Sequence, residues 1–140
     1  MNYGRLVLAA IVATVVDAVY GVVVWGMVLN GEFGRYPEIY RPAGDMSGFA
    51  VMFTGILTAM LVVSWIYAKG YEGGSGVAEG ARFGLLVGLF VVFAFASVNY
   101  ATLNVGRKIA VMTAAAGLVE WLVIGTIIGL VYKPAARSPR

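Results

Sequence analysis

The chain has 140 residues, of which 61% are hydrophobic and 12% charged, and its mean hydropathy is +0.87. These values lie outside the range of soluble globular domains and indicate an integral membrane protein. The absence of cysteine and histidine excludes disulfides, thiolate chemistry and the usual ligands of haem and zinc, so we expect no cofactor and no metal site. The net charge of +3 is not gathered into a basic run, so nucleic acid is not an expected partner.

Four apolar runs are each long enough to cross a lipid bilayer, because roughly 20 helical residues span the hydrocarbon layer. They cover residues 6–29, 48–68, 77–103 and 109–132. The expected fold class is therefore all-α: a polytopic membrane protein with a single domain, whose four transmembrane helices form a bundle of two antiparallel hairpins.

The first run carries one charged residue, Asp17, about halfway along its length. A signal peptide is the alternative interpretation of this segment, but its apolar region would be only about 7 to 15 residues long. Residues 6–29 exceed that length and offer no A-x-A cleavage site at their far end. We therefore expect a retained membrane helix.

Residues 30–47 form the longest polar stretch and combine prolines and charges with Phe33, Tyr36 and Tyr40. We expect this loop to lie outside the hydrocarbon. Two interpretations stay open: a solvated connector, or an aromatic and basic segment that lies on the headgroups or covers the bundle as a lid.

Glycines of the second half of the chain fall in one loop and along two of the apolar runs. The loop 69–76 is glycine-rich but lacks the preceding strand and the Gly-Lys-Ser/Thr ending of a phosphate-binding loop, so it indicates a flexible turn. Glycines recur at four-residue spacing in the third run, where they would let helix backbones approach closely, and the fourth run contributes further glycines. These helix-packing candidates are Gly80, Gly84, Gly88, Gly117, Gly125 and Gly129.

A second acid, Glu120, lies midway along the fourth run, and a short basic tail follows at residues 133–140. An acid at the centre of a membrane helix costs on the order of 2.5 to 3.5 kcal/mol, so Asp17 and Glu120 should face the bundle interior. Packing the first helix beside the fourth would bring the two carboxyls together. Since no lysine or arginine lies at that depth, we expect at least one acid to hold a proton at pH 7 and the pair to titrate together.

The candidate proton or ligand site consists of Asp17, Glu120, Asn99, Tyr20 and Trp121. A purely structural role is the alternative. Protonated acids can bridge helices through hydrogen bonds worth roughly 0.6 to 2 kcal/mol each, without any traffic of ions or substrate.

The lysines and arginines indicate an orientation. Six of them fall on the side of the two termini and four on the opposite side. The positive-inside rule then places both termini and the loop 69–76 in the cytoplasm and the loop 30–47 outside the cell. The expected location is a bacterial inner membrane.

Three short motifs carry a resemblance to a known family. They are Val16-Asp17-Ala18 in the first run, Asn99 to Leu103 at the end of the third, and Glu120-Trp121 in the fourth. Together they resemble a bacterial family of four-helix integral membrane proteins known only as a domain of unknown function, over nearly the whole chain. The resemblance implies a four-helix fold and a polar mid-membrane site at Asp17, Asn99 and Glu120, and it supplies no activity. The family pattern has aspartate in the fourth helix, so Glu120 departs from it by one methylene.

Three functions remain open from the sequence. The first is proton-linked binding or transport of a small molecule or ion by the carboxyl pair. The second is a non-catalytic subunit that packs against a larger membrane complex, or against copies of itself, through the face with Gly80, Gly84 and Gly88. The third, an intramembrane enzyme acting on a lipid-like substrate, is less expected. A cavity that reaches the acids from one side would favour the first or third function, and a closed core would favour the second.

Overall fold

A computed structural model describes residues 1–42 and 44–132. Within these residues the chain forms helices and no strand, and four helical spans are long and apolar enough to cross a membrane. The all-α four-helix fold class is thereby confirmed. The expected basic tail at 133–140 lies outside the described residues.

Two of the four spans contain π-helical segments. The first span joins α1 (Tyr3–Tyr20) to η1 (Gly21–Val28), and the second is α3 (Phe49–Gly70). The third joins α4 (Gly76–Val91), η2 (Val92–Ala96) and α5 (Ser97–Thr102), and the fourth is α6 (Arg107–Tyr132). A single helical turn, α2 (Asn30–Phe33), follows the first span. Each span begins and ends within three residues of the run expected from the sequence.

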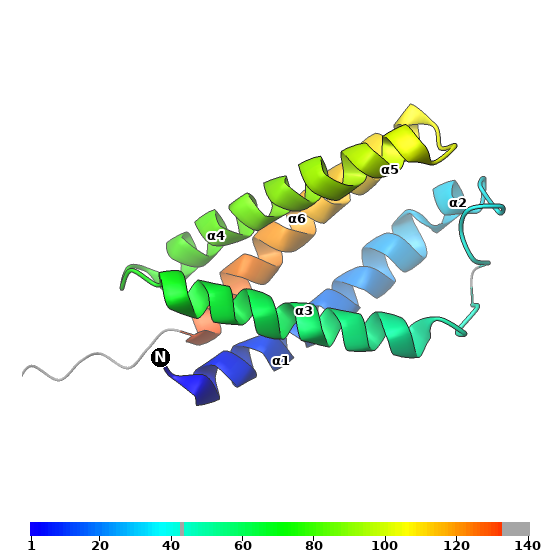
Figure 1. Cartoon of the computed structure of the whole chain (residues 1–140). Helices are drawn as coiled ribbons and strands as arrows, with labels where there is room; N and C mark the ends of the chain where they lie inside the picture. The colour runs from blue at the N-terminus through cyan, green and yellow to red at the C-terminus, as the bar shows by residue number, and fades with distance from the viewer. Residues whose placement is uncertain (43, 133–140) are drawn as a thin grey trace, which may run out of the picture.

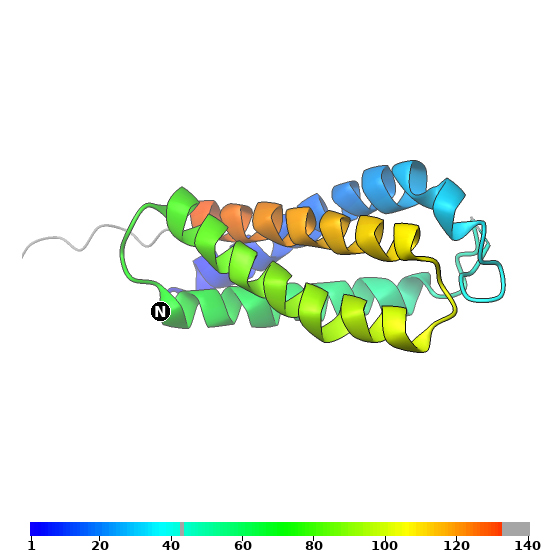
Figure 2. The same ribbon diagram turned by 90° about the horizontal axis from the view of Figure 1, so that it is seen from above.

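The helices form two antiparallel hairpins, α1 with α3 and α4 with α6 (Figure 1). Helix α6 packs against both α4 and α1, and α1 packs in turn against α3. The N-terminus and the turn between α3 and α4 lie at one end of the bundle, here called the terminal end. The segment after η1 and the turn between α5 and α6 lie at the opposite end, here called the loop end (Figures 1 and 2).

Glycines bring α4 and α6 into backbone contact in the terminal half of the bundle. A Cβ atom built on Gly76 would lie 2.5 Å from Gly129 O, and one built on Gly84 would overlap the carbonyl oxygen of Trp121. Only glycine allows helices to approach this closely. The glycine face of α4 is therefore covered by α6 of the same chain, and a separate subunit cannot use it in this structure.

Gly117 differs from these glycines, because a Cβ atom built on it would meet nothing within 4 Å. It therefore makes no close helix contact.

The packing of α1 against α3 and α6 also depends on small residues. Ala9, Ala10 and Ala13 on α1 are completely buried. They contact larger buried side chains such as Met60 on α3 and Ile128 on α6. The same small face of α1 carries Asp17 at its far end, so close packing of α1 on α6 sets the depth of this acid.

Candidate functional site

Asp17 and Glu120 meet at the interface of α1 and α6. Asp17 is only 8% exposed, Glu120 is half-buried, and their carboxyl groups lie close enough to interact with each other. Two ionised carboxylates can only accept hydrogen bonds, so a bond between them requires a proton on one of the two. Neither acid forms an ion pair with any described residue. The geometry therefore suits a pair of acids that shares one proton.

Two side chains from the first span fix Glu120 and its helix. The indole Nε1 of Trp25 donates a hydrogen bond to Oε1 of Glu120 at 3.1 Å. The hydroxyl of Tyr20 donates to the carbonyl oxygen of Ala116 at 2.8 Å, one turn before Glu120 on α6. Because both bonds join the first span to the fourth, they hold the carboxyl of Glu120 at one position in the bundle.

Trp25 is a site residue that the sequence did not reveal, because a tryptophan near the end of an apolar run is typical of the membrane interface. In a regular α-helix a residue eight positions after Asp17 would lie about 80° around the axis from it. The π-helical turns of η1 begin at Gly21 and change this register before Trp25. Such turns are frequent at functional sites, but no sequence pattern here signals one.

A cavity of about 320 Å³ lies between the first and third spans, with α6 as its floor. It follows α6 from Ile109 to Trp121, a rise of about 18 Å along the helix axis. Six rings contribute to its wall: Trp25, Phe33, Tyr40, Phe95, Tyr100 and Trp121. Its polar groups are few and include Glu120, Asn99 and Thr113. The cavity thus joins the carboxyl pair to the loop end of the bundle.

The five candidate site residues take different places around this cavity. Glu120, Trp121 and Asn99 line it, whereas Asp17 lies beside Glu120 at its inner end. Tyr20 contacts the backbone of α6. Asn99 is exposed and bonds no other described side chain, so it belongs to the outer part of the cavity and not to the acid pair. Gly117, expected to pack helices, also lines the cavity.

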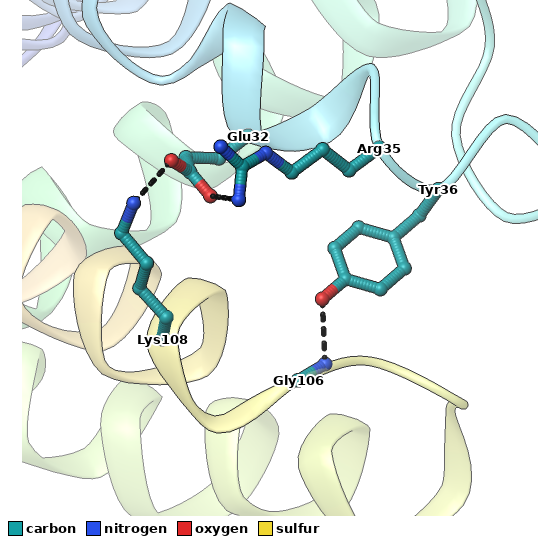
Figure 3. Close-up of polar contacts among 5 residues, drawn as sticks. All are labelled: Glu32, Arg35, Tyr36, Gly106 and Lys108. Carbon is teal, nitrogen blue, oxygen red and sulfur yellow. Dashed lines mark hydrogen bonds and ion pairs between the residues drawn. The ribbon is translucent and has the colours of Figure 1, made fainter.

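The segment after η1, residues 30–40, lines the loop end of the cavity with Phe33 and Tyr40. Its polar contacts with the turn before α6 and the start of α6 are shown in Figure 3. Glu32 forms an ion pair with Lys108 at the start of α6, with 2.5 Å between Oε1 and Nζ. The hydroxyl of Tyr36 accepts a hydrogen bond from the backbone N–H of Gly106 at 2.9 Å. The hydrogen bond that Lys108 donates to Glu32, and to a lesser degree the charge of Arg35, holds the pKa of Glu32 below its ordinary value of 4.5. Of the two interpretations of this loop, the contacts favour a lid.

Rings connect this lid to the acid pair. Trp25 stacks with Phe33 at a centroid distance of 6.2 Å, and Phe33 packs against Tyr40 at 4.8 Å. Because Trp25 also bonds Glu120, three aromatic rings lead from the lid to the carboxyl pair.

Fold and site together define a class: a small four-helix membrane protein with two facing acids at the inner end of an aromatic cavity. Within the described residues, no group of three or more acidic, histidine or cysteine side chains could hold a metal ion. Comparison of the chain with protein-family models, with curated proteins and with solved structures found no match.

Proposed function

We propose that this protein binds a small organic cation in the cavity and exchanges it for a proton held by Asp17 and Glu120. The observation that carries the proposal is the position of the acid pair at the inner end of a cavity walled by aromatic rings. Carboxylates attract a cation, and the faces of aromatic rings add to that attraction where water is scarce. The few polar groups in the wall favour a ligand whose surface is mainly apolar.

The exchange follows from charge balance. An acid pair with one proton carries a single negative charge. When a monovalent cation takes the place of that proton between the two carboxylates, the proton leaves to water, and the occupied site again carries a single negative charge. Protons and cations therefore compete for the same oxygens, and each weakens the binding of the other by the same factor. Cation affinity should rise with pH, since fewer protons then compete.

The direction of access is part of the same proposal. The arginine and lysine distribution favours cytoplasmic termini, so the loop end would face outward in a bacterial inner membrane. The cavity reaches the loop end, and its ligand would come from the outside.

The proposal can be tested on purified protein in lipid nanodiscs with tetraphenylphosphonium as the probe cation. Binding by the native chain should release protons into a weakly buffered solution, detected with a pH-sensitive dye. Asp17→Asn and Glu120→Gln should each abolish the proton release and weaken binding by tenfold or more, about 1.4 kcal/mol. Glu38→Gln, which alters an exposed acid of the loop, is the matched control and should behave as the native chain. Equal binding without proton release by native and Glu120→Gln protein would refute the proposal.

A second candidate function, assembly with a partner helix, has one observation in its favour. The outer face of α3 carries a shallow groove lined by Ala50, Thr54, Gly55 and Thr58, and a Cβ atom on Gly55 would meet nothing within 4 Å. Small residues of this kind support close helix association in membranes. If α3 joins copies of the chain, Gly55→Leu should reduce the oligomer mass measured in mild detergent, and an unchanged mass would remove this candidate.

A further inference from the structure

The contacts that hold the lid join two distant parts of the chain. Glu32 and Lys108 are 76 residues apart in sequence, and Tyr36 and Gly106 are 70 apart. Figure 3 shows both contacts side by side, bridging the segment after η1 to the turn before α6 and to the first residues of α6. The lid is therefore fastened to the start of the fourth span and to the turn that precedes it.

The lid also supplies part of the cavity wall. Phe33 and Tyr40 line the same cavity as Glu120, so a ligand lying between the acid pair and the loop end would touch both rings. If the lid moved away from Gly106 and Lys108, these two rings would leave with it. The cavity would then be open along its outer part.

The fastening contacts are of a kind that can break and reform. The side chains of Lys108 and Arg35 are 63% and 65% exposed, so water can replace their contacts with Glu32 at little change in free energy. The single-turn helix α2 contains Gly31 and is followed directly by Gly34. Leu29, the residue directly before α2, is by contrast buried, with only 3% of its surface exposed. A buried residue before a weakly fastened segment provides a fixed point about which that segment can move.

We infer that residues 30–40 form a gate over the cavity, with Glu32–Lys108 and Tyr36–Gly106 as its latch and Phe33 and Tyr40 as its ligand-contacting wall, a role that rests on the proposed function. Opening the latch exposes the cavity at the loop end, and closing it places the two rings on the ligand. Trp25 links the gate to the site, because its ring stacks on Phe33 and its N–H bonds Glu120.

The gate can be tested without any ligand, because the native chain has no cysteine. Thr113→Cys places one thiol in the cavity wall, where a permanently charged methanethiosulfonate reagent should react slowly. Adding Lys108→Gln or Tyr36→Phe weakens the latch and should raise the reaction rate about fivefold, as expected for loss of one exposed polar contact. Val111→Cys, an exposed residue on α6 that does not line this cavity, is the matched control. A Thr113→Cys rate that neither latch variant changes would overturn the gate.

A second measurement separates failure of the gate from failure of the proposed function. Glu32→Cys with Lys108→Cys can be bridged by a short bismethanethiosulfonate and released again with reductant. Bridging should slow both association and release of tetraphenylphosphonium by about tenfold or more, while Arg41→Cys with Ser47→Cys, bridged within the loop itself, should leave the rates unchanged. If bridging changes neither rate while Glu120→Gln abolishes binding, the gate is wrong and the proposed function stands. If the native chain binds no cation but the Thr113→Cys rates change as expected, the gate stands and the proposed function is wrong.

Discussion

The indole N–H of Trp25 on η1 and the carboxylate of Glu120 on α6 are joined by a hydrogen bond of 3.1 Å. Both residues line the same cavity. Trp25 contacts Phe33 of the lid with its ring and bonds Glu120 of the acid pair with its N–H. A half-buried carboxylate depends strongly on such a donor, because hydrogen bonds to charged groups are worth about 1.5 to 3 kcal/mol.

Replacing this indole should therefore affect both stability and binding. Trp25→Phe keeps a ring next to Phe33 and removes the N–H donor. We expect a loss of about 1.5 to 3 kcal/mol in the free energy of unfolding and a weaker affinity for the probe cation. The control is Trp65→Phe, which changes an exposed tryptophan near the C-terminal end of α3. Thermal unfolding in nanodiscs measures the difference, and equal melting temperatures for the two variants would show that the Trp25–Glu120 bond contributes little.

The shared proton can be observed directly by infrared spectroscopy. If one proton joins Asp17 and Glu120, Asp17→Asn and Glu120→Gln should each remove the same protonated-carboxyl band from the spectrum at pH 7, since an amide N–H then bonds the remaining carboxylate. The double variant should show no further loss. Two separate bands, each removed by only one substitution, would mean that the acids do not share a proton.

The glycine contacts predict a sharp difference between two glycine-to-alanine changes. Gly84→Ala would drive a methyl group against the backbone of α6, and overpacking of this kind costs about 1 to 3 kcal/mol. Gly55→Ala meets open space on α3 and should be neutral or slightly stabilising, because alanine favours the helix more than glycine does. Melting temperatures of the two variants test this, and a harmless Gly84→Ala would contradict the backbone contact of α4 with α6.

The latch has a predictable pH dependence. Because Lys108 lowers the pKa of Glu32 in the folded protein, the ion pair contributes its full stability above pH 4.5, the ordinary value for this carboxyl. That contribution is lost as the pH falls through the lowered value. Carbon-13 NMR of the Glu32 side chain should show titration below 4.5, and Lys108→Gln should move it back toward that value. A Glu32 titration that is identical in native and Lys108→Gln protein would show that the latch pair does not form in solution.

Much of the fold could be predicted from residue order alone. The apolar runs located the four spans because bilayer thickness fixes the length of a membrane helix. The equal depth of Asp17 and Glu120 indicated that they would meet if their helices packed together, and α1 does pack against α6, with the two acids close enough to interact.

The sequence was silent on features that depend on contacts between distant segments. It did not show that α6, and not another subunit, covers Gly80 and Gly84, because a glycine face carries no sign of its partner. The ion pair of Glu32 with Lys108 joins α2 to the start of α6, two segments that no sequence pattern pairs. The π-helical register that turns Trp25 toward Glu120 was equally invisible, since apolar residues surround it on every side.

The glycine contacts between α4 and α6 bear on the end of the bundle at which the cavity can open. They hold α4 and α6 together by backbone contact in the terminal half of the bundle. In the loop half, the cavity separates the first span from the third, and the exposed ion pair of Glu32 with Lys108 helps to close it. Opening toward the terminal end would require Gly76, Gly80 and Gly84 to leave α6 along two turns or more. Under the proposed function, a ligand would therefore enter and leave the cavity at the loop end, because passage to the terminal end would require these backbone contacts to separate.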